Sequence, residues 1–230
     1  LMNVDNMSRK FKNKRVRAAA VEAMAAAADT LGITSEELAD RIVPDLGFDR
    51  NLCRVFDYGK RQFNVYLKPS LEMEVFSGDK QIKTLPKPGT TDDKEIAEAA
   101  FNEFKEVKKQ LKNVVATQRS RLEYVLMCDR KWTSENWEKL FVGNAVMHCF
   151  AVGLIWGIYE KGSLKDTFRY MDDGSFTTAD GDEFILPNDA QIGLVHPLEL
   201  TEEQIAVWKE QLSDYELTQP FDQLGRMVFR

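Results

Sequence analysis

The sequence lacks the short motifs that mark the commonest enzyme classes. It contains no GxGxxG and no GxxxxGK followed by Ser or Thr, so the usual loops that cradle nucleotide phosphates are absent. It also contains no HExxH, no paired histidines and no GxSxG elbow, which removes the commonest zinc-hydrolase and serine-hydrolase interpretations. We therefore predict no cofactor, and we lean towards a protein that is not an enzyme.

Cysteine and histidine are scarce in this chain. The three cysteines, Cys53, Cys128 and Cys149, lie far apart and form no CxxC pair, so the sequence indicates neither a disulfide framework nor a zinc site. The first residues are polar and basic and lack the apolar core of a signal peptide. We therefore expect a protein of a reducing compartment, the cytoplasm.

Long hydrophobic runs are also missing. One stretch without charged residues, 142–159, approaches the roughly 20 residues of a membrane-spanning helix. It is interrupted by Asn144, His148 and three glycines, and its second half resembles a buried β-strand more than a helix. We expect no membrane partner.

A strong excess of positive charge is absent as well. The net charge of −6 argues against a whole-domain electrostatic footprint for DNA or RNA. Local basic patches are present near the N-terminus and on a predicted helix, and a solvated helix face explains them more simply than nucleic acid does. A nucleic-acid-associated module stays as an alternative, and its candidate contacts are Arg15, Arg17, Lys105, Lys109 and Lys112.

The first 50 residues predict a helical, repeat-like segment. A basic helix that runs into an alanine-rich stretch is expected to end at Gly32. Thr34 and Glu37 then form a capping-box pattern, which begins a short helix that stops before Pro44. Two short helices with a tight turn resemble one unit of a helical array.

The pattern of residues 51–230 predicts an α+β domain that forms one globular unit. A period of two over 54–83 predicts an antiparallel β-meander, and 85–90 is a proline-rich linker. A long amphipathic helix follows, with an apolar stripe that we expect to include Ile96. The rest predicts a second set of short antiparallel strands with flanking helices: helices near 133–141, 144–150 and 201–212, and strands near 154–159, 166–170, 176, 184–186 and 191–195.

An acidic loop is the only candidate metal site in the sequence. Its carboxylates could bind a hard cation, but their spacing does not match an EF-hand, so a solvated loop is the preferred interpretation. The candidate ligands are Asp172, Asp173, Asp180 and Asp182.

His196 is the best candidate for chemistry, because it ends an apolar strand and precedes a proline. Glu216 and Arg226 lie downstream and could converge with it as a general acid/base site that binds an anion. A buried polar network that only fixes the tail would use the same residues, and it is the preferred interpretation. His148 is assigned no role.

Several strings of the sequence resemble a family of bacterial domains of unknown function, the family numbered 4132 (DUF 4132). The C-terminal strings, His196–Leu200 (HPLEL) and Gln219–Arg226 (QPFDQLGR), are the most specific, and Asp57–Gly59 and Leu85–Gly89 fit the same pattern. The resemblance spans roughly residues 28 to 229. Such domains resemble the C-terminal part of proteins labelled molybdate metabolism regulator, some of which also carry helical repeats and a WGR domain.

The resemblance implies little about activity, because the family has no agreed reaction or catalytic residues. The leading hypothesis is a noncatalytic interaction or regulatory module at the C-terminal end of a larger bacterial protein. Its partners would be the other domains of that parent, helical repeats and a WGR domain among them. The alternative is an enzyme or binding domain for a small anionic or nucleotide-like ligand that uses His196 and Arg226.

Overall fold

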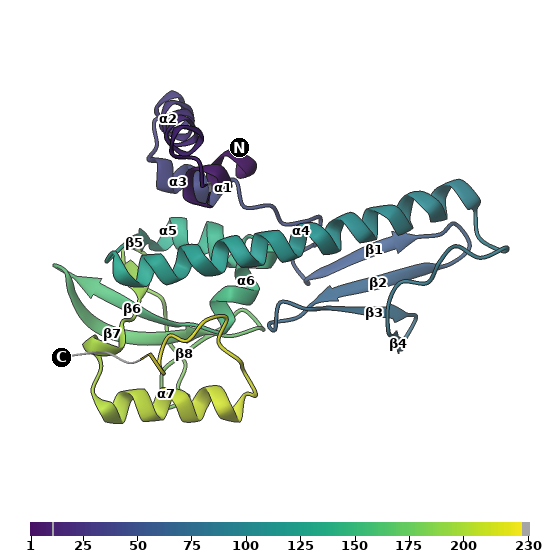
Figure 1. The fold of residues 1–230 in the computed structure, drawn as a ribbon. Coiled ribbons are helices and arrows are strands. Elements are labelled where there is room, and N and C mark those ends of the chain that lie inside the picture. The colour runs from purple at the N-terminus through teal and green to yellow at the C-terminus, as the bar shows by residue number, and fades with distance from the viewer. Residues whose placement is uncertain (11, 227–230) are drawn as a thin grey trace. The chain divides into compact units, whose positions relative to one another are not determined.

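The structure, a computed structural model, describes residues 1–10 and 12–226 (Figure 1). The chain divides into two compact units, Leu1–Pro44 and Asp45–Arg230, and each is described by itself.

The first unit consists of helices. They are α1 (Met2–Lys10), α2 (Lys14–Leu31) and α3 (Ser35–Arg41). The predicted end at Gly32, which has a φ of 66°, and the predicted capping box of Thr34 and Glu37 are both confirmed. The prediction of one continuous basic helix before Gly32 is wrong, because the Asn13 side chain accepts a hydrogen bond from the Arg15 amide (2.9 Å) and so caps a new helix.

The second unit begins with the predicted meander, which is confirmed. Its strands are β1 (Cys53–Asp57), β2 (Gln62–Leu67), β3 (Met73–Ser77) and β4 (Lys80–Ile82), and they pair in that order, all antiparallel. Alternate residues such as Phe63, Val65 and Val75 are buried, as the period of two predicts for a sheet with one covered face.

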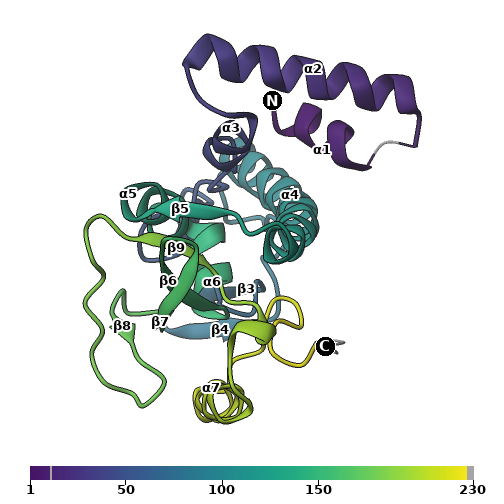
Figure 2. The same cartoon turned by 90° about the vertical axis from the view of Figure 1, so that its left-hand side faces the viewer.

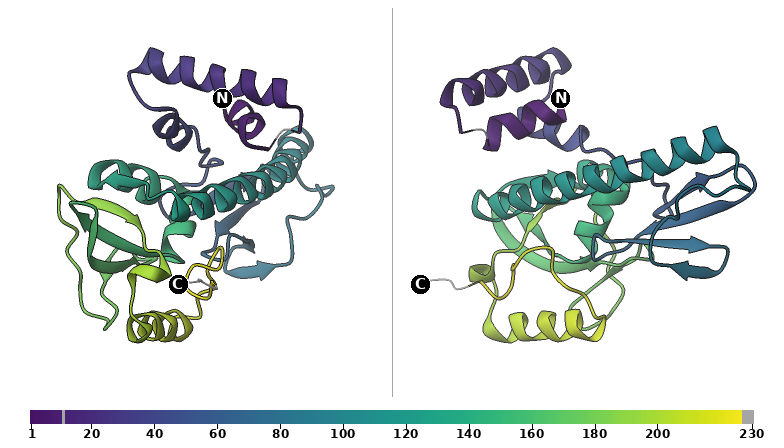
Figure 3. Two further views of the ribbon diagram at one scale, coloured as in Figure 1. Left: turned by 60° about the vertical axis from the view of Figure 1, so that its left-hand side comes forward. Right: turned by 45° about the vertical axis from the view of Figure 1, so that its right-hand side comes forward.

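Helix α4 (Lys94–Met127) lies across both halves of this unit. It begins at Asp93, whose side chain accepts a hydrogen bond from the Ile96 amide (3.1 Å), and its 34 residues make it about 51 Å long. Its first half lies along the four-stranded sheet and its second half reaches the five-stranded sheet (Figures 1 and 3). The predicted stripe is buried except for Ile96, which is 46% exposed because Ala97, one position further around the helix, occupies the covered face.

The remaining elements build a five-stranded antiparallel sheet with order β5-β9-β6-β7-β8. The strands are β5 (Lys131–Thr133), β6 (Ile155–Glu160), β7 (Ser163–Tyr170), β8 (Phe176–Thr177) and β9 (Gln191–Leu194). The helices are α5 (Ser134–Trp137), the π-helical turn η1 (Glu138–Val142), α6 (Ala145–Val152), the 3-10 turn η2 (Pro197–Glu199) and α7 (Glu202–Asp214).

Two local predictions in this region are wrong. Residues 184–186 form no strand, because the neighbouring chain offers only one isolated bridge, between Thr177 and Glu183, and Ile185 is 81% exposed. Strand β5 was not predicted, since three residues carry too little periodicity and its partner β9 lies far along the chain.

The two faces of this sheet are covered by different helices. Trp156 of β6 contacts Trp137 of α5 with ring centroids 5.2 Å apart, whereas its neighbour Ile155 joins a buried cluster with Trp208 of α7. Helices α5 and α7 accordingly lie on opposite sides of the sheet (Figure 2). The fold class is α+β with two antiparallel sheets, as predicted. Within the described part of the chain, none of the helices combines the length and hydropathy of a membrane span.

Candidate functional site

His196 lies at the start of η2, two positions after the last residue of β9. Its Nδ1 atom accepts a hydrogen bond from the Leu198 amide (3.2 Å), and its own amide donates to Oε2 of Glu199 (2.8 Å). This reciprocal pair is a capping box, closed by a histidine in place of Ser or Thr. The HPLEL string is therefore the sequence of a capped turn.

The same Glu199 oxygen accepts a second hydrogen bond, from the hydroxyl of Tyr159 (2.8 Å). Burial and the neighbouring Glu199 carboxylate raise the pKa of Tyr159 well above its usual range, so this hydroxyl stays a donor. The ammonium of Lys131 lies 3.6 Å from the centroid of the Tyr159 ring and pairs with Asp129.

A hollow of about 420 Å³ opens beside His196, where α4 ends. We call it the α4-end hollow, and it is lined by Val125, Leu126, Met127, Asp129, Arg130, Lys131, Leu194, His196, Leu198 and Glu199. Two of its apolar side chains are strongly exposed, Met127 at 64% and Leu198 at 47%. The lining of this hollow therefore combines exposed apolar side chains with charged side chains of both signs.

The other two catalytic candidates do not line this hollow. Arg226 donates from Nη2 to Oε1 of Glu123 on α4 (2.8 Å). Glu216 is exposed after the end of α7 with a φ of 52°, and its amide donates to the Ser213 carbonyl (2.9 Å). The predicted convergence of Glu216 and Arg226 on His196 is not seen in the lining of the hollow.

The tail is held by the amide side chain of Gln223, which is fully buried. Its Nε2 donates to the carbonyls of Ile155 (2.8 Å) and Val195 (2.9 Å), and its Oε1 accepts from the Ile155 amide (2.9 Å). Gln219 in turn donates to Oε1 of Gln223 (3.1 Å) and to the Gly153 carbonyl (3.3 Å). Both glutamines of the QPFDQLGR string therefore satisfy backbone groups at the sheet end, a role that the sequence analysis missed.

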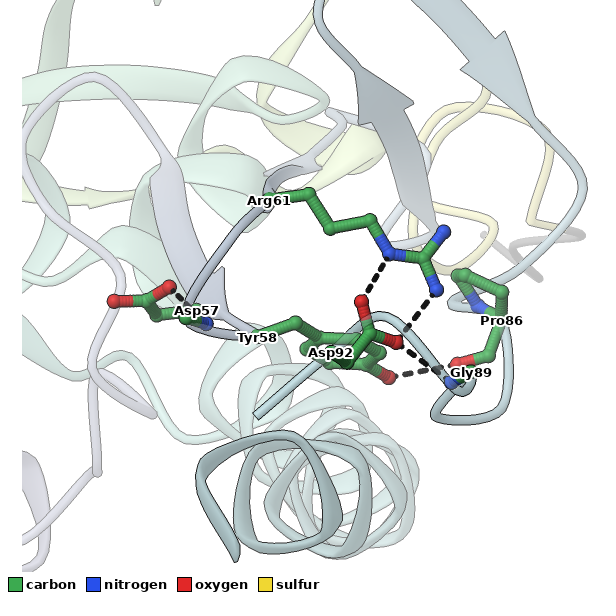
Figure 4. A network of polar contacts seen from close by, with 7 residues as sticks. Asp57, Tyr58, Arg61, Pro86, Gly89 and Asp92 are labelled. Carbon is green, nitrogen blue, oxygen red and sulfur yellow. Dashed lines mark hydrogen bonds and ion pairs between the residues drawn. The ribbon is translucent and has the colours of Figure 1, made fainter. Parts of the chain in front are cut away.

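The linker 85–90 is fixed by a polar network (Figure 4). The Tyr58 hydroxyl donates to the Pro86 carbonyl (2.7 Å), and the Asp92 carboxylate accepts from the Gly89 amide (2.6 Å). Arg61 holds Asp92 through two hydrogen bonds of 2.8 Å each. The Asp57–Gly59 and Leu85–Gly89 strings thus form one connected clamp.

The acidic loop uses part of its charge in its own turns. Asp173 accepts hydrogen bonds from the amide (2.9 Å) and the hydroxyl (2.6 Å) of Ser175, and these bonds lower the pKa of Asp173. Asp172, Asp180 and Asp182 are exposed. Across residues 1–10 and 12–226, no three His, Cys, Asp or Glu side chains are grouped in a way that could hold a metal ion.

The candidate nucleic-acid contacts are all exposed but belong to two separately described units. Arg15 and Arg17 lie on α2, and Lys105, Lys109 and Lys112 lie on α4. The Lys105 ammonium rests 4.1 Å from the centroid of the Phe101 ring. Of these three lysines on α4, Lys112 lines a second hollow, whereas Lys105 and Lys109 do not line it.

That second hollow, of about 400 Å³, lies between α4 and the meander. We call it the α4 groove, and it is lined by Leu71, Glu72, Met73, Val75, Lys83, Thr84, Phe104, Lys108, Leu111, Lys112, Val115, Ala116 and Arg119. Aliphatic and aromatic side chains form its floor, and four cations and one carboxylate form its rim.

Comparison with known proteins gives the family. Residues 79–230 match the family described as Domain of unknown function (DUF4132). The chain belongs to this family. It is also 34% identical, over 230 residues, to the Escherichia coli (strain K12) protein described as Uncharacterized protein YehI, and the alignment covers 98% of this chain and 19% of YehI. The chain thus spans about a fifth of the curated relative that it matches, and no solved structure matches it.

The DUF4132 strings found in the sequence are explained here by structure. The HPLEL string caps a turn, and the QPFDQLGR string satisfies backbone groups. The Asp57–Gly59 string holds the linker that contains Leu85–Gly89, through the hydrogen bond from Tyr58 to Pro86. The α4 groove could not be found in the same way. The sequence spacing places Lys108, Lys112 and Arg119 on one face of a helix. It does not show that residues of β3 lie opposite this face and complete the hollow.

Proposed function

We propose that this DUF4132 chain is a noncatalytic interaction module of a larger bacterial protein, and that its contact surface is the α4-end hollow. The observation that carries the proposal is the exposure of Met127 and Leu198, two apolar side chains that line this hollow. Large apolar side chains at the rim of a concave, charged surface are typical of a site that another protein surface covers.

The proposed partner is another part of the parent protein. The alignment leaves about four-fifths of YehI outside the region that this chain matches, so a parent of that kind supplies many further segments. The mixed charges of Asp129, Arg130 and Lys131 suit a polar rim of a protein interface. The resemblance to proteins labelled molybdate metabolism regulator supports a regulatory purpose for such contacts.

The geometry gives less support to the alternative of an acid–base enzyme. The Nδ1 atom of His196 already accepts a hydrogen bond from a backbone amide, and Arg226 is paired with Glu123. A catalytic role would need an anion-binding cation beside His196. Lys131 is instead occupied by Asp129 and the Tyr159 ring, and the Arg130 guanidinium lies 4.8 Å from the centroid of the Trp132 ring.

The proposal is tested by measuring binding between this chain and the rest of a parent protein, purified separately. We expect Met127→Glu and Leu198→Glu each to weaken binding at least about tenfold, which corresponds to about 1.4 kcal/mol. Ile185→Glu is the matched control, because Ile185 is 81% exposed on a distant loop segment that does not line the hollow, and it should leave binding unchanged. Equal binding by all three variants, or no binding by the unmodified chain, would reject the proposal.

A further inference from the structure

We infer that the α4 groove is a binding site for a small amphiphilic anion, a molecule with an aliphatic chain and an anionic head group. This inference is independent of the α4-end hollow, because no residue lines both hollows.

The rim of the groove concentrates positive charge on an acidic protein. Lys108, Lys112 and Arg119 stand along α4, and Lys83 stands on the side of the meander. Glu72 is the only carboxylate among the lining residues, although the whole chain carries a net charge of −6. A concave surface with charge of one sign concentrates field lines, so this groove attracts anions even though the protein as a whole repels them.

These four cations have no acidic partners in the part of the chain that the structure describes. The ion pairs found there use other side chains, such as Lys68 with Glu74, next to the groove. The four charges are therefore available to an anionic group from outside.

The floor of the groove is apolar and only partly covered. Phe104, Leu111 and Val75 form its buried base, at 5%, 4% and 2% exposure. Met73 and Val115 are half-buried, so they still present apolar surface to water. An aliphatic chain lying on these side chains would remove that surface from water, which is favourable in proportion to the apolar area that is covered.

The size of the groove fits a small molecule. Its volume of about 400 Å³ lies in the range of small-ligand pockets, which are mostly apolar with a few polar groups that fix orientation. From Phe104 to Arg119 the wall of α4 extends about 22 Å, because a helix rises about 1.5 Å per residue, so an extended chain has room along it. The floor offers no exposed aromatic platform for stacked bases, which argues against single-stranded nucleic acid.

The test uses dodecanoate, below its micelle concentration, and the full 230-residue chain in a calorimetric titration. We expect saturable binding of one dodecanoate, at least tenfold weaker binding of butyrate, which lacks the long chain, and no comparable binding of dodecylammonium, which reverses the head-group charge. Equal affinity for dodecanoate and butyrate, or for dodecanoate and dodecylammonium, would overturn the inference.

Two variants and one control test whether dodecanoate binds in the α4 groove. The triple variant Lys108→Gln, Lys112→Gln and Arg119→Gln should weaken binding at least tenfold, and the matched variant Lys105→Gln with Lys109→Gln, on the same helix but outside the lining, should change it less than twofold. Ala116→Trp, at an exposed position of the lining, should obstruct the groove and abolish binding without touching a cation. Binding that survives both the triple variant and Ala116→Trp lies elsewhere and contradicts the inference.

A membrane surface is the competing source of the same chemistry. Vesicles of phosphatidylcholine with and without phosphatidylglycerol are therefore titrated in parallel, and we expect no binding that depends on Lys108, Lys112 and Arg119. Vesicle binding that requires these residues, together with no binding of free dodecanoate, would replace the small amphiphile by a lipid bilayer and overturn the inference.

Discussion

Arg61 and Asp92 form a bidentate ion pair that joins the β1–β2 turn to the segment just before α4, with both nitrogen–oxygen distances at 2.8 Å (Figure 4). The guanidinium also lies 5.1 Å from the centroid of the Phe63 ring and 5.5 Å from that of Tyr58. Since Asp92 accepts from the Gly89 amide as well, one carboxylate fixes the linker, the turn and the start of the long helix together.

This pair predicts a pH-dependent contribution to stability. The hydrogen bonds from Arg61 and then from the Gly89 amide lower the pKa of Asp92, so the contribution is fully present above the unfolded-state pKa and is lost as the pH falls through the lower folded-state pKa. Arg61→Ala should therefore lower the melting temperature clearly at pH 7 and much less at pH 3. Thermal unfolding followed by circular dichroism measures the difference.

The control for this prediction is the exposed pair of Glu135 and Lys139 on consecutive helical turns. Because both side chains are mostly solvated, Lys139→Ala should change the melting temperature at pH 7 less than Arg61→Ala does. An equal loss in the two variants would mean that the clamp contributes no more than an ordinary surface pair.

Gln223 supports a second prediction, about the tail. Gln223→Ala leaves the amide of Ile155 and the carbonyl of Val195 without their side-chain partner in a buried place, whereas the Ile155 carbonyl keeps the hydrogen bond from the Val195 amide (3.3 Å). An unsatisfied buried polar group costs about 1–3 kcal/mol, so we expect a total loss of about 3 kcal/mol in urea unfolding. Gln191→Ala, at an exposed position of β9, should change the free energy of unfolding by less than about 0.5 kcal/mol.

Local signals made the fold largely readable from the sequence. Thr34 and Thr201 form their capping boxes with residues three positions ahead, and the meander repeats every second residue, so each signal lies inside a few residues of chain. Strand β5 was missed because its identity depends on β9, about 60 residues away. Short elements that exist only through a distant partner leave no periodicity of their own.

The candidate site was less readable for the same reason. His196 follows a strand, as predicted, but its hydrogen-bond partners are residues of its own turn, whereas Arg226 pairs with Glu123, 103 positions away. In the sequence Arg226 lies near Glu216, and nothing there indicates that its partner is on α4. The α4 groove likewise depends on β3 and α4 together.

A third prediction concerns His148, whose pKa is lowered in the folded protein, whereas a histidine that gains a partner usually has a raised pKa. It lies within α6 at 7% exposure, its Nδ1 is 3.1 Å from the Tyr170 hydroxyl, and burial lowers its pKa although Asp172 acts to raise it. The unfolded chain takes up a proton near pH 6.5 and the folded chain does so only at lower pH, so stability falls as the pH drops below about 6.5.

Urea unfolding at pH 7.5 and pH 5.5 measures this effect. The unmodified chain should lose more stability between these two values than His148→Gln, which cannot take up the proton. A pH dependence that persists in His148→Gln would assign the effect to another group.

Gly59 and Gly174 allow a final prediction that separates backbone strain from steric overlap. Both have a positive φ, 82° and 91°, which an L side chain adopts at a cost of about 1–2 kcal/mol. A Cβ at Gly59 would lie 2.8 Å from the Cβ of Asp93, the residue that caps α4, whereas a Cβ at Gly174 would have no neighbour within 4 Å.

Gly174→Ala should therefore cost only the strain of about 1–2 kcal/mol, and Gly59→Ala should cost about 1–3 kcal/mol more, since overlap forces the start of α4 away from the β1–β2 turn. Urea unfolding of the two variants gives the difference directly. Equal losses would show that the turn and the helix start separate freely, and that the clamp of Arg61 and Asp92 does not depend on the close approach at Gly59.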